Sequence, residues 1–313
     1  MLNFRKLKKI KGDASFRKFY RNKKNNSIVV YSKKDRAKNL LIYDAINKIL
    51  IKNKISAPKL LNQNYKNHYI EIEDLGDKTL NKVLKYKKIN KKLIFGKIVT
   101  ILKRLQSIKD RSIKNFKGQK YKVMKYSNKI LLSEACLFSE WYALRKLNKF
   151  KTIKFEKKYK KEVKKLLTKL NFKDDTFVHR DFHVSNLMLV NNRIGVIDSQ
   201  DALIGNRSYD LASLVDDVRL KTSKILKKKI FNLYIDSQKK LDKKKIKNDF
   251  EILSILRNLK IIGIFTRLAV RDKKDNYIKL IPYAWDLISL RINQNEIFLD
   301  LKKLLKDNFK KNL

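Results

Sequence analysis

Polar side chains recur at fixed spacing in residues 177–198, whose sequence is FVHRDFHVSNLMLVNNRIGVID. His179, Asp181 and Asn186 follow the order H-x-D-x-x-x-x-N, and Asp198 ends the segment after a second apolar run. In this order, one carboxylate can accept the proton of a hydroxyl group, while an amide oxygen and a second carboxylate hold Mg²⁺ against phosphate oxygens. The spacing therefore predicts phosphoryl transfer to a hydroxyl group.

Each of these four side chains has its own expected role. Asp181 is the candidate general base, because a carboxylate at this point can orient the acceptor hydroxyl and take its proton. Asn186 and Asp198 are the candidate Mg²⁺ ligands. His179 completes the catalytic loop, where we expect its ring to pack and to hydrogen-bond rather than to shuttle protons. The alternative without chemistry is a polar loop closed by a capped turn.

Two more carboxylates follow closely in the chain. Asp201 is near enough to Asp198 to lie beside the metal or the acceptor. Asp210 begins a predicted helix, where the positive end of the helix dipole stabilises a carboxylate. Its side chain could instead reach back and brace the catalytic loop, and the sequence does not separate these two roles.

A turn near the N-terminus is the candidate phosphate cover. The sequence GDASFR precedes a predicted strand, and we expect Gly12, Ser15, Phe16 and backbone amides to touch the phosphates of ATP. The turn lacks the pattern G-x-G-x-x-G, and the chain has no G-x-x-x-x-G-K-[ST] sequence. The phosphate cover is therefore predicted from position and composition.

The rest of the nucleotide site is predicted on later strands. Glu73 and Leu75 lie at the end of a strand whose backbone groups are expected to bind adenine. A kinase would carry a lysine on its third strand, but Ser32 stands at that position here. Lys33 is the nearest cation, although it comes one residue late and would face the other side of a regular strand.

Hydrophobic periodicity predicts an α+β chain with a β-rich and a mainly helical lobe, and the order of the polar residues at 179–198 is the one that a protein-kinase-like fold requires. Residues 1–76 form a small β-rich lobe that binds nucleotide, with strands at 15–20, 27–32 and 65–74 and a helix at 35–52. Residues 77–313 form a larger, mainly helical lobe for catalysis and substrate binding. Within it the hairpin that ends at Asp198 is flanked by predicted helices at 90–109, 128–148, 156–171, 208–217, 222–239, 248–270, 276–292 and 295–307.

The chain is strongly basic, with a formal net charge of +48. Lysine outnumbers arginine about four to one, and the lysines are spread through every segment. Nucleic-acid grooves use arginine heavily, because its planar fork binds phosphates and bases. We therefore attribute the charge to composition and expect no specific nucleic-acid partner, only weak and salt-sensitive binding to polyanions.

Other composition features limit the class of protein. The single cysteine, Cys136, excludes an internal disulfide and a cysteine-based zinc site. No apolar run is long enough to span a membrane, and the basic N-terminus lacks the apolar core of a secretory signal. We expect a cytoplasmic protein that does not associate with membranes.

The motifs resemble those of the aminoglycoside phosphotransferase/choline kinase superfamily, which has a protein-kinase-like fold. Three sequences carry the resemblance: HRDFHVSNLM, GVIDSQDA and GNRSYDLASL. A closer similarity, to bacterial anomeric kinases of N-acetylmuramate and N-acetylglucosamine, involves residues 12–21, 70–80, 131–142 and 259–288. The resemblance implies ATP-dependent phosphorylation of a sugar hydroxyl in cell-wall recycling, with Asp181 as base and Asn186 and Asp198 as Mg²⁺ ligands.

The chain departs from the family pattern at two points. Ser199 stands where an aromatic residue is usual, which would loosen the packing beside the metal. Asn206 and Arg207 replace a common turn that contains proline. Neither departure removes a catalytic group.

Sugar contacts are expected by position only. Glu134 and Trp141 lie on one predicted helix and Arg267 on another. An arginine suits the lactyl carboxylate of muramic acid, and an aromatic ring suits a sugar face. Helix packing with exposed charges explains each of these residues equally well.

The sequence thus predicts an ATP- and Mg²⁺-dependent kinase that acts on C1 of N-acetylmuramate or N-acetylglucosamine. One alternative is a related phosphotransferase for choline, another amino alcohol or an aminoglycoside. A second is a catalytically inactive, basic nucleotide-binding protein, against which the presence of Asp181, Asn186 and Asp198 argues.

Overall fold

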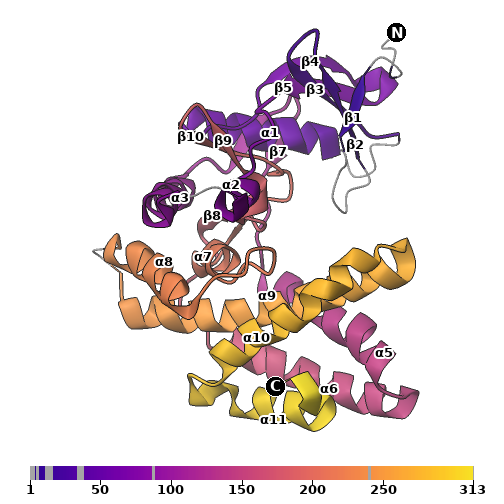
Figure 1. Ribbon diagram of the computed structural model, residues 1–313, viewed down its shortest axis with the longest axis vertical. Helices are drawn as coiled ribbons and strands as arrows, with labels where there is room; N and C mark the ends of the chain where they lie inside the picture. Colours follow the sequence, from indigo (N-terminus) through magenta and orange to yellow (C-terminus); the bar gives the residue numbers. More distant parts are fainter. Residues whose placement is uncertain are drawn as a thin grey trace. The chain divides into compact units, whose positions relative to one another are not determined.

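The computed structural model describes residues 4, 7–10, 17–33, 39–86, 89–238 and 241–312 (Figure 1). The chain divides into two units. The first unit combines residues 1–124 with 183–203, and the second combines residues 125–182 with 204–313. The first contains an antiparallel sheet and the second is mainly helical, which confirms the predicted α+β class. The lobe boundary expected after residue 76 remains a prediction.

A five-stranded antiparallel sheet forms the core of the first unit, in the order β1-β2-β3-β5-β4. The sequences of β3 and β5, SIVVY and YIEIE, are rich in β-branched and aromatic residues, which suit a pleated, partly buried surface. The strands are β1 (Lys8–Ile10), β2 (Lys18–Asn22), β3 (Ser27–Tyr31), β4 (Leu60–Asn64) and β5 (Tyr69–Glu73).

Helix α1 (Asn39–Lys52) packs on one face of this sheet (Figure 1). Alternate residues of a strand point to the same face, so Val30 of β3 and Ile70 of β5 both face the helix. They form one apolar cluster with Leu40 and Tyr43 of α1, and all four side chains are buried. This cluster fixes α1 against the sheet.

A β-hairpin from later in the chain completes the first unit. Asn191 and Asn192 form its two-residue turn with φ values of 44° and 61°, the left-handed conformation that such turns require and that asparagine tolerates. The N–H group of Val196 donates a 2.7 Å hydrogen bond to the carbonyl of Ser56, which attaches the hairpin to the segment after α1. The hairpin strands are β9 (Leu187–Val190) and β10 (Arg193–Val196), after the 3₁₀ turn η5 (Val184–Asn186).

Three helical segments and a two-stranded sheet make up the rest of the described part of the first unit. The side chain of Asn90 caps the start of α3 by accepting a 3.1 Å hydrogen bond from the N–H group of Leu93. These elements are α2 (Leu80–Tyr86), α3 (Lys91–Ser107), β6 (Ser112–Lys114) and β7 (Lys120–Lys122), together with the 3₁₀ turn η3 (Tyr65–Asn67).

The second unit is built around α9 (Lys243–Asp272), the long helix labelled in Figure 1. Gly263 allows α9 to approach the preceding helices closely: a Cβ atom at this position would lie 2.3 Å from the carbonyl of Leu137. The surrounding elements are α4 (Asn128–Leu137), the π-helical turn η4 (Phe138–Ala143), α5 (Leu144–Lys146), α6 (Lys149–Leu167), α7 (Ser208–Val215), α8 (Lys224–Asp236), η6 (Asp275–Leu280), α10 (Ile281–Ile292), η7 (Glu296–Phe298), α11 (Leu299–Phe309) and η8 (Lys310–Asn312). Strand β8 (Thr176–Val178) pairs with β11 (Leu203–Gly205).

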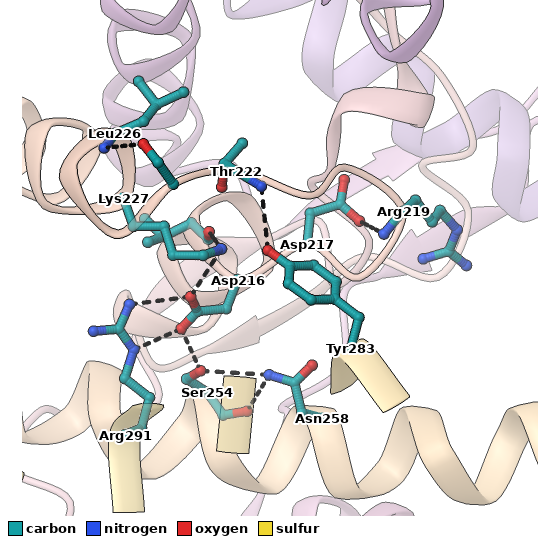
Figure 2. A network of polar contacts seen from close by, with 12 residues as sticks. Asp216, Asp217, Arg219, Thr222, Leu226, Lys227, Ser254, Asn258, Tyr283 and Arg291 are labelled. Carbon is teal, nitrogen blue, oxygen red and sulfur yellow. Dashed lines mark hydrogen bonds and ion pairs between the residues drawn. The ribbon is translucent and has the colours of Figure 1, made fainter. Parts of the chain in front are cut away.

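A buried carboxylate, that of Asp216, connects three helices of the second unit (Figure 2). It accepts a 2.6 Å hydrogen bond from Ser254 of α9 and two hydrogen bonds, of 2.8 and 3.0 Å, from Arg291 of α10. It also forms a 3.4 Å ion pair with Lys227 of α8. Burial opposes ionisation of Asp216, but Arg291 outweighs it and holds the pKa of the carboxyl below its ordinary value. The network offsets the cost of burying these charges and joins α8, α9 and α10.

Most predicted helices are present, with three changes in their form. The helix predicted at 128–148 contains the π-helical turn η4. The helices predicted at 276–292 and 295–307 begin as the 3₁₀ segments η6 and η7, before α10 and α11. Strand β4 was not predicted, because its sequence LLNQN does not alternate. Among the residues that the structure describes, no helix has both the length and the apolar character needed to cross a bilayer.

Candidate active site

The two candidate metal ligands, Asn186 and Asp198, flank the open end of the β9–β10 hairpin. Leu187 of β9 pairs with Val196 of β10, and the next residue, Ile197, donates a 3.0 Å hydrogen bond from its N–H group to the carbonyl of Asn186. Asp198 follows directly and has a φ of 63°, a left-handed conformation that aspartate tolerates better than most residues. The hairpin register thus brings Asn186 and Asp198 to neighbouring positions in the first unit.

The carboxylate of Asp198 is held by its Oδ1 atom. Arg17 donates a 2.8 Å hydrogen bond from Nη2, and Gln200 donates a 3.2 Å hydrogen bond from Nε2. Gln200 in turn accepts a 2.9 Å hydrogen bond from Nη1 of Arg17. None of the described residues donates a hydrogen bond to Oδ2, and the Asp198 side chain is 42% exposed. One oxygen is therefore fixed and the other is accessible.

This donor set suits Mg²⁺. Magnesium prefers oxygen ligands and is usually held by one or two protein groups together with water and substrate phosphates. Asn186 and Asp198 supply an amide oxygen and a carboxylate oxygen, and no group of three histidine, cysteine or acidic side chains that could hold a metal occurs among the described residues. The residues therefore fit a metal that is shared with phosphates better than a closed protein site.

Asp201 and Ser199 flank the metal-site residues in different ways. Asp201 is exposed, and its Oδ2 atom accepts a 2.8 Å hydrogen bond from Gln200, which also contacts Asp198. Ser199 is fully buried and donates a 2.6 Å hydrogen bond to the side chain of Asn47 on α1. The small hydroxyl of Ser199 thus forms a buried polar contact with α1, and the expectation that serine loosens the packing here remains a prediction.

The candidate base belongs to the second unit, in the loop after β8. Its neighbour Arg180 has a φ of 74°, so the backbone turns in a left-handed conformation directly before Asp181. The buried carboxylate of Asp210 on α7 accepts hydrogen bonds of 2.7 and 3.0 Å from the backbone N–H groups of His179 and Arg180. Of the two roles left open for Asp210, the structure therefore shows the brace. His179 is buried, as expected for a structural member of the loop.

A buried arginine lies beside the candidate base within the second unit. The guanidinium of Arg257 on α9 lies 3.9 Å from Oδ1 of Asp181, and its side chain is 2% exposed against 49% for Asp181. A positive charge therefore lies beside the carboxylate of the candidate base. Burial raises the pKa of Asp210, the residue that braces this loop, to about 7.

Glu134, a predicted sugar contact, lies in an ion-pair network beside this loop. It pairs with Arg180 and, at 2.7 Å, with Lys260 of α9, and it accepts a hydrogen bond from Tyr126. Burial opposes ionisation of Glu134, but Lys260 and Arg180 outweigh it and hold the pKa of the carboxyl below its ordinary value. The negative charge of Glu134 is thus compensated within the protein.

The predicted nucleotide contacts are described only in part. Gly12, Ser15 and Phe16 lie outside the described residues. Lys33 follows β3 and is exposed. The other two predicted contacts are at the end of β5.

Glu73 and Leu75 have backbone and side-chain partners of their own. The N–H group of Glu73 donates a 2.9 Å hydrogen bond to the carbonyl of Lys59. Leu75 is buried, and its Cδ1 atom approaches Gly195 so closely that a Cβ there would lie 2.8 Å away. Leu75 therefore packs against the hairpin that carries Asp198.

The other two predicted sugar contacts, Trp141 and Arg267, also belong to the second unit. Trp141 lines a surface pocket of about 790 Å³ together with Arg145 and the end of α9. Arg267 is half-buried on α9, and burial and Arg271 lower the pKa of its guanidinium. Its buried Nε atom has no hydrogen-bond partner among the described residues.

Three contacts of the site were not predicted: those of Arg17, Gln200 and Arg257. Arg17 lies in the sequence GDASFRKFYR, two residues before Phe19. Residues two apart on a strand face the same side of the sheet, so this spacing indicates that Arg17 lies on the apolar face with Phe19. Arg257 interrupts the apolar sequence of a buried helix, which was the available signal for a buried charge with a partner.

Comparison with known proteins agrees with this geometry. A family model described as "Phosphotransferase enzyme family" matches residues 6–237. Among solved structures, a choline/ethanolamine kinase family protein from Mesorhizobium loti has a TM-score of 0.64 at 10% identity and covers 96% of this chain and 92% of that chain. The gentamicin complex of aminoglycoside phosphotransferase APH(2″)-IIa has a TM-score of 0.63 at 16% identity and covers 95% and 94%. These similarities confirm the protein-kinase-like fold.

Relatives with a named activity are also similar in sequence. N-acetylmuramate/N-acetylglucosamine kinase of Neisseria meningitidis is 36% identical over 166 residues, which are 50% of this chain and 49% of that protein. The protein of the same name from Caulobacter vibrioides is 25% identical over 74% of this chain and 64% of its own length, and the one from Pseudomonas aeruginosa is 26% identical over 94% and 86%. The chain thus spans about half to two thirds of the first two relatives.

Proposed function

Since the chain belongs to the phosphotransferase enzyme family, we propose that it transfers the γ-phosphoryl group of ATP to the C1 hydroxyl of N-acetylmuramate or N-acetylglucosamine. The observation that carries the proposal is the hairpin pairing of Asn186 with Ile197, which puts the two candidate metal ligands at neighbouring positions. Three relatives named N-acetylmuramate/N-acetylglucosamine kinase support the choice of acceptor.

Each residue has a defined part in the proposed reaction. Asp181 orients the C1 hydroxyl and accepts its proton, a contribution of about 10²–10⁴-fold in rate. Asn186 and Asp198 hold Mg²⁺, which when bound neutralises charge on the β- and γ-phosphates. Asp210 fixes the backbone before Asp181, and the guanidinium of Arg257 lies beside the Asp181 carboxylate.

The charges near Asp181 favour a neutral or anionic acceptor over a cationic one. Choline and aminoglycosides are cations and need an acidic or aromatic pocket. Within the second unit, Asp181 interacts electrostatically with two cations, Arg257 and Lys260, and with the carboxyl group of Asp210. The nearby charge of Glu134 is neutralised by Lys260 and Arg180. A sugar acceptor is therefore preferred to choline, an amino alcohol or an aminoglycoside.

The proposal is tested by ADP release from ATP and Mg²⁺ with a panel of acceptors. The panel contains N-acetylmuramate, N-acetylglucosamine, choline, ethanolamine and kanamycin, with GTP as a second donor. We expect turnover with the two N-acetylated sugars and ATP. The 1-O-methyl glycoside of N-acetylglucosamine, in which C1 is blocked, should not react.

Each other outcome contradicts a specific part of the proposal. Turnover with choline or kanamycin alone would reject the sugar, and turnover of the methyl glycoside would reject C1. If no acceptor releases ADP although ATP binds, the protein is a nucleotide-binding protein without this activity. A ³¹P spectrum of the product identifies the phosphorylated hydroxyl.

A further inference from the structure

Arg17 is a buried cation directly before β2; it ends the predicted phosphate-cover turn GDASFR, where the sequence assigned it no contact of its own. It is 6% exposed, and its Nη2 and Nη1 atoms donate hydrogen bonds of 2.8 and 2.9 Å to Asp198 and Gln200. A buried guanidinium is costly unless it is paired. The carboxylate that pairs with it is the candidate metal ligand, so the charge of Arg17 lies at the proposed phosphate site.

The strand register explains how Arg17 reaches this position. Lys18 pairs with Tyr31 and Phe19 with Val30, so the next position along β2, Arg17, lies opposite Ser32. Ser32 is where a third-strand lysine was expected in a kinase. It is 1% exposed, and its hydroxyl has no hydrogen-bond partner among the described residues. The small side chain of Ser32 leaves space on the face that the long side chain of Arg17 occupies.

The surroundings of Arg17 confirm which face it occupies. Its guanidinium lies 5.5 Å from the ring centre of Phe19 and 5.7 Å from that of Tyr43 on α1. Tyr43 belongs to the apolar cluster between α1 and the sheet. Arg17 therefore points from the sheet towards the helix side, where aromatic rings and the Asp198 carboxylate stabilise its charge.

We propose that Arg17 supplies the positive charge of the donor-phosphate site, delivered from β2 in place of a lysine on β3. This inference rests on the proposed function, because it assumes a nucleoside triphosphate as donor. The guanidinium holds Oδ1 of Asp198, leaves Oδ2 for Mg²⁺, and adds its own charge to the attraction of the phosphates. Lys33, which is exposed after β3, is the competing cation.

The test is the affinity for nucleotides with different numbers of phosphates. Binding of ATP, ADP and adenosine in the presence of Mg²⁺ is measured by calorimetry for the wild type, Arg17→Met, Arg17→Lys and Lys33→Met. We expect Arg17→Met to weaken ATP binding roughly ten- to a hundredfold, the effect of losing hydrogen bonds to a charged group, while the affinity for adenosine is retained. Arg17→Lys keeps the positive charge but loses the planar guanidinium that donates two hydrogen bonds at once, so we expect the affinity for ATP to fall roughly two- to tenfold.

Arg21→Met is the matched control. Arg21 lies on the same strand, and it pairs with Asp74 and Asp77, so the same substitution also removes a paired guanidinium. The ratio of ATP to adenosine affinity should stay at the wild-type value in this variant. Circular dichroism shows whether each variant is folded. If Arg17→Met is unfolded, Arg17→Lys provides the test.

Two kinds of failure can be told apart. If the wild type binds no nucleotide, the proposed function is overturned, and the assignment of Arg17 with it. If the wild type binds ATP and both Arg17 variants keep its ratio of ATP to adenosine affinity, only the assignment is overturned. The assignment is also overturned if the Arg17 variants weaken the binding of adenosine as much as the binding of ATP, because an equal loss indicates a structural role. It is overturned as well if Lys33→Met is the only variant in which the affinity no longer depends on the number of phosphates.

Discussion

The Oδ1 atom of Asp210 accepts a 3.0 Å hydrogen bond from the backbone N–H group of Arg180, the residue that precedes Asp181. Its Oδ2 atom accepts a second, 2.7 Å bond from the N–H group of His179. One buried carboxylate thus fixes two consecutive peptide groups of the loop that carries the candidate base. Arg180 has a left-handed backbone conformation, which is unfavourable for residues other than glycine. The two hydrogen bonds to Asp210 offset the free-energy cost of this conformation.

Asp210→Asn should change the pH dependence of stability. Burial raises the pKa of Asp210 from 3.8 to about 7, so between these values the folded state binds more protons than the unfolded state. The contribution of Asp210 to stability is therefore fully present below about pH 4 and is lost as the pH rises through 7, on the order of a few kcal/mol. Urea unfolding of Asp210→Asn from pH 4 to 8 should show a flatter profile than the wild type.

The same substitution also has an effect that does not depend on pH. Asparagine offers one acceptor oxygen to two backbone donors, so we expect a loss of about 1–3 kcal/mol throughout. Equal slopes for Asp210→Asn and the wild type between pH 4 and 7 would show that Asp210 does not titrate there.

Asp181→Asn should lower kcat without weakening ATP binding. The amide keeps the size of the side chain but cannot accept the proton of the acceptor, so we expect a decrease of about 10²–10⁴-fold. Steady-state ADP release gives kcat, and calorimetry gives the affinity for ATP. Asp286→Asn, at an exposed position of α10, serves as the control and should match the wild type. Full activity of Asp181→Asn would exclude Asp181 as the base.

Asp198→Asn should raise the Mg²⁺ concentration needed for activity. The variant keeps an oxygen ligand but loses the negative charge, and we expect the half-saturating Mg²⁺ concentration to rise at least roughly tenfold. Loss of this charge also leaves Arg17 buried without its carboxylate, so a lower melting temperature should accompany the change.

The control for Asp198 is another carboxylate of the first unit. Asp110 forms a 2.6 Å ion pair with Lys52 and has no role in the proposed metal site, so Asp110→Asn should leave the Mg²⁺ dependence unchanged. A wild-type Mg²⁺ dependence in Asp198→Asn would remove Asp198 from the metal site.

Local sequence patterns were sufficient for the hairpin and for the loop before it. Asn191 and Asn192 favour the left-handed turn, and the apolar runs on either side set the register, so the positions of Asn186 and Asp198 follow from a short segment. The choice between a cap and a brace for Asp210 did not follow, because its partners are 30 and 31 residues away. The contact between Arg17 and Asp198 spans 181 residues and depends on the assembled sheet.

The form of the helices was predictable only where the usual period holds. A period of 3.6 residues predicts a helix at 128–148 but contains no signal for the π-helical turn η4 (Phe138–Ala143). This turn lies where Gly263 brings α9 against the backbone of Leu137 and Phe138. The departure from regular geometry therefore coincides with a tertiary contact that the local sequence does not encode.

Gly263→Ala should destabilise the protein, and Gly96→Ala should not. A Cβ at position 263 would lie 2.3 Å from the Leu137 carbonyl and 2.6 Å from the nitrogen of Phe138, and backbone atoms cannot yield as a flexible side chain can. We expect a loss of about 1–3 kcal/mol or more. Gly96 on α3 has no atom within 4 Å of a Cβ, so alanine there should add roughly 0.5–1 kcal/mol through its helix propensity. Thermal melts of both variants measure the difference, and a fall in melting temperature of equal size for both would contradict the packing argument.

Arg267→Met should discriminate between the two proposed sugars. N-acetylmuramate carries a lactyl carboxylate that N-acetylglucosamine lacks, and a guanidinium is the side chain best suited to bind it. Arg267 is half-buried, and its Nε donor is buried without a hydrogen-bond partner among the described residues. We therefore expect KM for N-acetylmuramate to rise roughly tenfold and KM for N-acetylglucosamine to stay unchanged.

Arg271→Met provides the control for this substitution on the same helix. Arg271 is exposed, and its guanidinium forms hydrogen bonds of 2.8 and 3.0 Å with Asp272. Its removal should leave both KM values at those of the wild type. Equal increases in KM for the two sugars in Arg267→Met would indicate a general packing role, because only N-acetylmuramate presents a carboxylate to the guanidinium. An unchanged KM for N-acetylmuramate would mean that another residue binds this carboxylate or that the acceptor lies elsewhere on the second unit.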